Sequence, residues 1–518
     1  MTTRRALLAN GVLAGGLALG LASGARGQGP AARATCSAGT FLGLREGGIA
    51  TFKGIRYGRA ARFMAPVAEP PAREPVRATS FAPSCPQAGD AGGEGLAFAE
   101  DCLALNVWTP DPDARAKRPV MVYIHGGAYS SGSANLERQD GRVLAEGGDV
   151  VVVSVNHRLN AFGYLYLARL DPRFADSGNA GQLDLILALQ WVRDNIAGFG
   201  GDPARVMVFG QSGGGAKIAT LMATPAAAGL FHRAATMSGQ QVTASGPLNA
   251  TARTRAYLAA LGVSPDDLST LATMPTTRLV EGLKVTDPVL GGGVYFGPVL
   301  DMRMLSRHPF WPDAAPQSLG VPMILGNTAG ETRAFIGPEK TRDLTWDNLA
   351  NRLAPELRID ILPEWVVAEY RLRFPTWSPT DVFYDATTCG RSWRGQVIEA
   401  EARARAGAPA WVYQVDFGAR QEPERGAFHS IDIALVFGTL GAKGSLTGTA
   451  ADARAASATL QSAFVAFART GDPGPAWPRY ELATRATMIV DARAHVEHDP
   501  RRWQRELFAR VPYIQPGT

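Results

Sequence analysis

Residues 206–221, VMVFGQSGGGAKIATL, decide the fold of this chain. The apolar run 206–209 predicts a short buried strand, and residues 216–222 predict the start of a helix. Between them lies the G-x-S-x-G pattern of a nucleophile elbow, with Ser212 in the tight turn from strand to helix. Side chains two positions before or after this serine would collide in such a turn, which requires Gly210 and Gly214. The N–H groups at the start of the helix would favour negative charge that develops beside Ser212.

Two other interpretations of this glycine-rich stretch are open. The first alternative is a strand-to-helix turn without chemistry, and the second is a loop that binds phosphate. A dinucleotide-binding loop has the pattern G-x-G-x-x-G, and here Ser212 occupies the place of its middle glycine. The P-loop ending Gly-Lys-Ser/Thr is also absent from the stretch. The elbow therefore fits better than either alternative.

The composition is that of a large globular enzyme. The chain has 518 residues, of which 46% are hydrophobic and 19% are charged. It has no Pro/Ser-rich linker, repeat or low-complexity run that would divide it, so we expect a single domain over residues 36–512. The formal net charge is +5, and no Lys/Arg cluster with interleaved aromatic residues indicates a nucleic-acid partner.

The N-terminus has the pattern of a targeting segment. Arg4 and Arg5 precede a weakly apolar run over residues 6–22, which is short for a membrane span. We expect residues 1–27 to be a signal peptide of the twin-arginine type and the mature protein to be periplasmic or secreted. On this interpretation no stable membrane anchor remains after cleavage; the alternative is an uncleaved anchor.

The cysteine and histidine spacing does not indicate a metal site. The four cysteines form no C-x-x-C, and the histidines show no zinc spacing. We therefore expect no metal, and chemistry on a serine nucleophile needs no cofactor. An even number of cysteines in an oxidising compartment does permit disulfides.

The order of predicted strands and helices indicates an α/β protein. An antiparallel hairpin is expected over residues 41–57, and a helix is expected over 179–196. Buried strands follow one another along the chain at 103–108, 119–124, 150–156, 206–209, 321–325 and 411–417, and an edge strand is expected at 488–491. Continuous apolar strands that alternate with helices predict a large, mostly parallel central sheet covered by helices on both faces. Residues 250–315 and 345–405 are expected to be largely helical or loop-like insertions.

A serine nucleophile needs a base, and His429 is the best candidate among the seven histidines. It follows the strand predicted at 411–417 and lies C-terminal to Ser212. That position matches the chain order serine, acid, histidine of an α/β-hydrolase. The alternative is a structural histidine, which is the role that we expect for His125.

The acid that would orient this histidine is less clear from spacing. Glu331 follows the strand predicted at 321–325 and lies between Ser212 and His429 in the chain. It would hold the imidazole tautomer and stabilise the imidazolium. Spacing leaves Asp287, Asp301 and Asp385 open as competitors.

A second glycine-rich loop, His125-Gly126-Gly127-Ala128, follows the strand predicted at 119–124. It is similar to the HGGG-type loop whose small residues let backbone N–H groups approach a tetrahedral oxyanion. The alternative is a generic glycine turn. Two such loops after two adjacent buried strands favour the oxyanion loop.

These motifs together resemble the type B carboxylesterase family of α/β-hydrolases, which is related to cholinesterases and lipases. The resemblance extends over about residues 38–510. It is carried by GIRYG at 54–58, EDCL at 100–103, LNVWTP at 105–110, HGG at 125–127, NHRL at 156–159 and FGGDP at 199–203.

The resemblance implies specific roles for particular residues. Ser212, Glu331 and His429 would form the catalytic triad, and the N–H groups of Gly127, Ala128 and Gly213 would form the oxyanion hole. The family also implies a disulfide between Cys85 and Cys102. Helical insertions, in residues 240–310 and 335–395, would form the walls of the pocket.

The function implied is that of an exported serine hydrolase that cleaves small-molecule carboxylic esters through an acyl-enzyme intermediate. An amidase, a transacylase or a polyester hydrolase could use the same triad. A non-catalytic binding protein of the cholinesterase-like adhesion kind would typically lack a triad residue, whereas all three are present here.

Two departures from the family pattern affect the expected substrate. The family usually has Glu before the serine and Ala after it, where this chain has Gln211 and Gly213. Cholinesterases also have a Trp between their first two cysteines that holds a choline cation, and residues 86–101 contain none. Because cations are held by aromatic faces and nearby negative charge, we expect neutral esters to be preferred over cationic ones.

Overall fold

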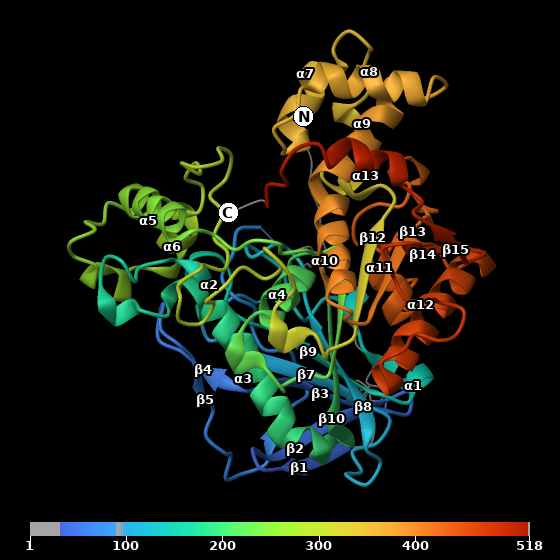
Figure 1. The fold of residues 1–518 in the computed structure, drawn as a ribbon. Helices are drawn as coiled ribbons and strands as arrows, with labels where there is room; N and C mark the ends of the chain where they lie inside the picture. Colours follow the sequence, from blue (N-terminus) through green and yellow to red (C-terminus); the bar gives the residue numbers. More distant parts are fainter. Residues whose placement is uncertain (1–31, 90–94, 96, 516–518) are drawn as a thin grey trace, which may run out of the picture.

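A computed structural model describes residues 32–89, 95 and 97–515, and the predicted signal peptide lies outside them. Its centre is a 13-stranded mixed sheet with helices on both faces, as predicted (Figure 1). In spatial order the path through the sheet is β1 (Ala32–Cys36), β2 (Gly39–Glu46), β3 (Ile49–Arg56), β7 (Ala104–Thr109), β9 (Val151–Val155), β8 (Arg118–Ile124), β10 (Gly201–Gln211), β11 (Arg233–Met237), β12 (Met323–Thr328), β13 (Ala410–Val415), β14 (Ala486–Val490) and β15 (His495–His498).

The middle of this sheet is parallel and its ends are antiparallel. Every neighbouring pair from β9 to β14 along the path is parallel, whereas the strands from β1 to β9 pair antiparallel. The short β6 (Val76–Arg77) pairs with β2, and β4 (Gly58–Arg59) pairs with β5 (Val67–Ala68) outside the main sheet. The carboxyl ends of the parallel strands therefore meet at one edge, where loops can bring side chains together.

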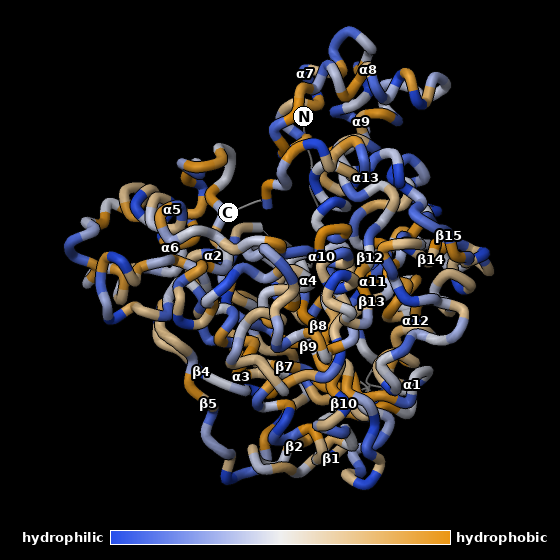
Figure 2. Tube along the Cα trace, viewed as in Figure 1, coloured by the Kyte–Doolittle hydropathy of each residue, from blue (hydrophilic) through white to orange (hydrophobic). Residues whose placement is uncertain are grey.

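Two apolar layers cover the faces of the sheet, because side chains alternate along each strand. On β8, Val122 packs in the layer that contains residues of α3 (Ala180–Asn195) and α4 (Gly213–Met222). Its neighbour Tyr123 packs in the other layer, with residues of α1 (Arg142–Gly148), α11 (Ile431–Phe437) and α12 (Ala451–Thr470). Figure 2 shows hydrophobic residues gathered around β8 and β10.

The remaining helices lie mainly in the long insertions. They are α2 (Asn160–Tyr164), α5 (Pro247–Leu261), α6 (Thr276–Gly282), α7 (Leu349–Leu357), α8 (Pro363–Arg373), α9 (Pro379–Thr388), α10 (Arg394–Arg405) and α13 (Arg502–Phe508). Residues of α7, α8, α9 and α13 share an apolar cluster of their own, at the top of Figure 1. None of the described helices combines the length and apolar character needed to span a bilayer.

The prediction of an edge strand at 488–491 was wrong in one respect. That strand is β14, and β15 pairs with it antiparallel on its outer side. β15 has the sequence HVEH and is largely exposed, so it lacks the apolar alternation by which strands are recognised.

The predicted disulfide is not formed in the structure, where all four cysteines are free thiols. Cys85 and Cys102 are nonetheless buried neighbours. A hydrogen bond with Cys85 and burial raise the pKa of the Cys102 thiol well above its ordinary value. The disulfide between them remains a prediction.

Candidate active site

Ser212 lies in the turn between β10 and α4, at φ 56° and ψ −125°. Its N–H donates a hydrogen bond to the carbonyl of Met237, 2.7 Å away. A Cβ added to Gly214 would lie 1.9 Å from the carbonyl oxygen of Ile124, and one added to Gly210 would lie 2.7 Å from the carbonyl carbon of Gly214. The glycines beside the serine are therefore required by close backbone packing, as expected for an elbow.

The loop at residues 126–128 packs directly on this elbow. Gly127 and Ala128 have positive φ angles of 96° and 54°. A Cβ on Gly126 would lie 3.2 Å from the Cβ of Ser212, and a Cβ on Gly213 would lie 2.0 Å from the carbonyl oxygen of Ala128. The close approach of this carbonyl explains why glycine follows the serine, where the family usually has alanine.

Lys217, on α4, anchors the same loop through a hydrogen bond. Its side chain is fully buried on α4, and Nζ donates a 2.6 Å hydrogen bond to the carbonyl of Ala128. Nζ also lies 4.8 Å from the ring centre of Tyr129. Burial lowers the pKa of Lys217 to about 7. Sequence reasoning missed this residue, although a lysine within the apolar stretch AKIATLM was a signal for it.

Glu331 and His429 meet beside the elbow. Glu331 begins a short 3-10 helix after β12, and its Oε2 is hydrogen-bonded to His429 Nδ1. Its Oε1 accepts hydrogen bonds from the backbone N–H of Thr328 at 2.7 Å and from the Asn327 amide at 3.3 Å. Burial opposes ionisation of Glu331, but the charge of His429 and these hydrogen bonds hold its pKa below the ordinary value.

Each competing acid has a different partner. Asp287 forms an ion pair with Arg253 at 2.7 Å, and Asp385 forms one with Arg501 at 3.1 Å. Asp301 accepts a 2.7 Å hydrogen bond from the side chain of Asn179. Of the four acids, only Glu331 contacts His429 in the described part of the chain.

Gln211 contacts the other ring nitrogen of His429, Nε2. Its Nε2 lies 3.0 Å from His429 Nε2, and the buried side chain also lies next to Gly126. A ring with Nδ1–H bonded to Glu331 keeps the lone pair on Nε2, which here accepts from the Gln211 amide. No hydrogen bond joins Ser212 to His429 among the described residues, so the serine hydroxyl would have to take the place of this amide.

Ser212 and His429 line one hollow of about 510 Å³. Its other walls come from the segment 126–139 and from residues 430 and 433, with Phe335 and Arg391 reaching in from the second predicted insertion. None of its lining residues belongs to the first predicted insertion, 240–310. The ring of Phe335 lies 4.9 Å from the ring of His429. Nothing in the sequence indicated which individual residues line this hollow.

His125 is buried and does not line this hollow. Its ring stacks on His157 at 4.6 Å between centroids, and Nδ1 lies 2.9 Å from the carbonyl of Gly126. Burial and the charge of Lys217 lower the pKa of His125 to about 3, so the ring is neutral at pH 7. This environment fits the structural role predicted for it.

The chain matches known proteins over nearly its whole length. A sequence model of the carboxylesterase family matches residues 30–507. A para-nitrobenzyl esterase of Bacillus subtilis (strain 168) is 34% identical over 91% of this chain and 97% of its own length. A phenmedipham hydrolase of Pseudarthrobacter oxydans is 32% identical over 89% of this chain and 96% of its own length. A solved carboxylesterase of Geobacillus stearothermophilus superimposes with a TM-score of 0.82 at 33% identity, over 92% of this chain and 99% of that one.

Proposed function

Because the chain belongs to the carboxylesterase family and is a carboxylic-ester hydrolase with the α/β-hydrolase fold, we propose that it works through an acyl-enzyme formed on Ser212. The observation that carries the proposal is the buried contact between Glu331 and the Nδ1 of His429, whose side chain lines the same hollow as Ser212. A carboxylate on Nδ1 holds the tautomer in which Nε2 can accept a proton, as a general base requires.

The proposed steps use only these groups. Ser212 Oγ attacks the acyl carbon while His429 Nε2 takes the hydroxyl proton, and the N–H groups of Gly127, Ala128 and Gly213 stabilise the oxyanion. When the ester C–O bond breaks, His429 returns the proton to the departing alcohol. Water then attacks the acyl carbon in the same way, which releases the acid and regenerates Ser212.

Labelling of the serine tests this mechanism. A fluorophosphonate should label the protein once, at Ser212, and labelling should abolish hydrolysis of p-nitrophenyl butyrate. Ser130 is an exposed serine in the same hollow, and Ser130→Ala protein should still be labelled. Label on another serine, or hydrolysis that survives complete labelling, would rule out Ser212 as the nucleophile. Amidase or transacylase activity on the same triad would appear as comparable turnover of the matching amide, or as acyl transfer to an added alcohol.

We propose that neutral esters react better than cationic ones. Gln211 is uncharged where a carboxylate would attract a cation, and the hollow is lined by Arg138 and Arg391. A missing aromatic face or charge should cost a cationic ester about 0.5–2 kcal/mol relative to a neutral one. The test compares kcat/KM for butyrylthiocholine with kcat/KM for its neutral 3,3-dimethylbutyl analogue. A tenfold preference for the cation would contradict the proposal.

We also propose that the protein is exported by the twin-arginine route. The double substitution Arg4→Lys and Arg5→Lys should leave precursor in the cytoplasm. Normal export of this variant would instead indicate the general secretory route.

In an oxidising compartment we propose that Cys85 and Cys102, which are hydrogen-bonding neighbours, form a disulfide. A loop of this size would stabilise the fold by about 3 kcal/mol in the chain-entropy model. Peptide mapping of exported protein without reductant would show the linked pair, and two free thiols would reject it.

A further inference from the structure

The charged side chains that line the hollow at Ser212 are arginines. Two arginines line it, Arg138 and Arg391, and no aspartate or glutamate is among its lining residues in the described part of the chain. The other polar side chains that line it are serines, glutamines and His429. A hollow with positive side chains and no acid attracts anions, and its low-dielectric walls strengthen the attraction.

The two arginines differ in their partners. Arg391 forms an ion pair with Glu356 at 3.1 Å, and its guanidinium lies 5.1 Å from the ring centre of Phe335. Arg138 lies on the 3-10 helix Glu137–Gln139, and no described carboxylate forms an ion pair with it. Its guanidinium is thus the charged donor in the hollow that remains available to a ligand.

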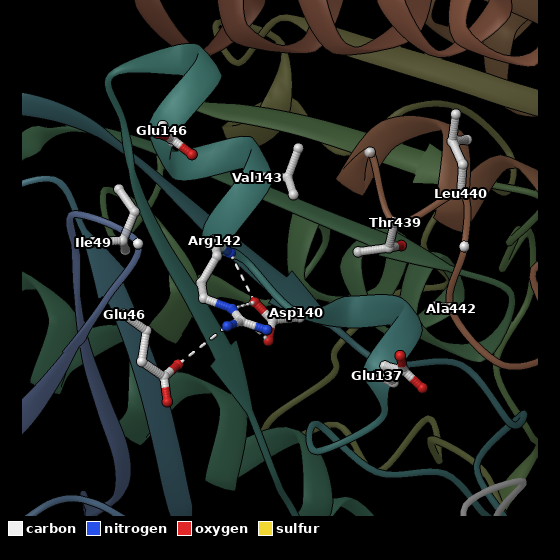
Figure 3. A pocket seen from close by; sticks show the side chains of 13 residues that line it. Glu46, Ile49, Glu137, Asp140, Arg142, Val143, Glu146, Thr439, Leu440 and Ala442 are labelled. Carbon is white, nitrogen blue, oxygen red and sulfur yellow. Dashed lines mark hydrogen bonds and ion pairs between the residues drawn. The ribbon is translucent and has the colours of Figure 1, made fainter. Parts of the chain in front are cut away.

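The nearest acids along the chain face elsewhere. Glu137 and Asp140 line a separate hollow, together with Glu46 and Glu146 (Figure 3). There Asp140 pairs with Arg142 at 3.0 Å, and Arg142 also reaches Glu46. The acids beside Arg138 in the chain are therefore engaged on the other side of the helix.

An unpaired cation in a partly buried site loses hydration without gaining a partner. Burial lowers the pKa of Arg138, with the phenol of Tyr123 opposing the shift, yet a guanidinium remains protonated at neutral pH. Its donors match the two oxygens of a carboxylate, and such charge-assisted bidentate hydrogen bonds are among the strongest in proteins. A bound carboxylate would supply the partner that the protein withholds.

We propose that the preferred substrates are esters that carry a carboxylate, such as half-esters of dicarboxylic acids, and that Arg138 binds this carboxylate. The inference rests on the proposed function of Ser212 and names the substrate class of that site. It extends the preference for neutral over cationic esters, because the same positive charge that repels a cation attracts an anion. The shared chemistry is the carboxylate, which could belong to the acyl or to the alcohol part.

Two isosteric ester pairs distinguish these sources. On the acyl side, p-nitrophenyl hydrogen adipate is compared with p-nitrophenyl 6-methylheptanoate, with non-enzymatic hydrolysis subtracted. On the alcohol side, 4-(butyryloxymethyl)benzoate is compared with 4-isopropylbenzyl butyrate. We expect the anion of at least one pair to have a kcat/KM about tenfold or more above its neutral isostere, as for hydrogen bonds to a charged group. Ratios of one or less in both pairs would overturn the inference.

Substitution of Arg138 tests the assignment of the residue. Arg138→Met should lower the favoured anionic-to-neutral ratio about tenfold or more, and Arg138→Lys should restore part of it, because an ammonium keeps the charge but not the bidentate geometry. Arg115→Gln, which removes an exposed arginine paired with Asp113, is the matched control and should keep the ratio. Equal losses on anionic and neutral esters in Arg138→Met would show that Arg138 does not bind the carboxylate.

The failure of this inference is separable from failure of the proposed function. Absence of Ser212 labelling and of hydrolysis of the neutral esters would refute the proposed function. Calorimetric titration with adipate tests the inference without turnover. Adipate should bind wild-type protein about tenfold more tightly than Arg138→Met protein. Equal affinities would reject the site.

Discussion

Two parts of the hollow at Ser212 are built in different ways. The glycine loops, residues 126–128 and 210–214, contact each other through backbone atoms, and a Cβ at Gly213 would lie 2.0 Å from the Ala128 carbonyl oxygen. The rim, formed by Leu136, Arg138, Phe335 and Arg391, consists of side chains from separate segments. The rim side chains are only partly buried, or exposed in the case of Phe335.

The difference separates chemistry from selectivity. The close packing of the two loops restrains their backbone, and fixed backbone donors are what the proposed stabilisation of an oxyanion requires. Rim side chains can change without disturbing the elbow, so they are free to set which ester enters. Substitutions in the glycine loops should therefore lower kcat, whereas substitutions in the rim should alter ratios between substrates.

On the proposed mechanism, the largest effect is expected from loss of Ser212 or His429. Ser212→Ala and His429→Ala should each lower kcat about a millionfold, and the double variant should lose little more, because the groups act as a unit. The measurement is kcat for p-nitrophenyl butyrate on variants whose circular dichroism matches wild type. Retention of more than a few per cent of wild-type turnover in Ser212→Ala would contradict the assignment.

A smaller loss is expected when the contact between the two loops is broken. Gly213→Ala places a methyl group against the Ala128 carbonyl and should displace an oxyanion donor, at a cost of about 10²–10³ in kcat. KM should change much less. Gly147→Ala is the matched control, because a Cβ there meets no atom within 4 Å. If Gly213→Ala had wild-type kcat, the loop would be more tolerant than its packing indicates.

Loss of the lysine below the loop should weaken activity without weakening the fold. Lys217→Met removes the hydrogen bond to the Ala128 carbonyl and should lower kcat roughly tenfold. The pKa of Lys217 is about 7 in the folded protein, below its ordinary value in the unfolded chain. Between these two pKa values the unfolded chain therefore binds more protons than the folded chain. Stability should rise with pH from about 7 towards the ordinary lysine pKa in wild type, and less so in the variant.

Melting temperatures at pH 6, 7 and 9 would measure this difference. A buried lysine that is charged below pH 7 costs stability there, so Lys217→Met should be at least as stable as wild type at pH 6. Identical pH dependence in both proteins would show that Lys217 titrates as an exposed lysine.

The smallest expected effect concerns Gln211, the residue before Ser212, and the pH dependence of kcat/KM. Gln211→Glu places a carboxylate beside His429 Nε2, which favours the protonated imidazole. The acid limb of the profile of kcat/KM against pH should move up by about one pH unit, because the unprotonated base then requires a higher pH. Gln211→Met removes the amide without adding charge and should leave the limb in place. A limb that does not move in Gln211→Glu would show that the new carboxylate points away from the ring.

Prediction from the sequence worked best where the signal is local. The elbow, the hairpin β2–β3 and the strands β7, β8, β9, β10, β12 and β13 follow from runs of apolar residues and from glycines, whereas β11 was not predicted. Spacing left Glu331 open against three aspartates, and it is the ion pairs and hydrogen bonds of those aspartates that distinguish them. β15 was missed because its exposed residues carry no apolar pattern.

The rim shows why other parts of the site could not be predicted. In the sequence Arg138 directly follows Glu137 and lies two residues before Asp140. This spacing predicts local charge pairing. Only the fold shows that those acids line a different hollow from the one that Arg138 lines. Likewise, nothing near Gln211 in the chain indicates a contact with His429, 218 positions away.

The sequence by itself determined the strand–elbow–helix unit at Ser212, the sheet of buried strands and the family. These depend on steric exclusion and apolar periodicity, which act between residues close in the chain and are legible in a single sequence. Only the tertiary structure decided which acid contacts His429, which carbonyl Lys217 contacts and which charged side chains line the hollow at Ser212. Those outcomes depend on contacts between distant segments, whose electrostatic consequences are set by separation and burial in the folded chain and not by order along it.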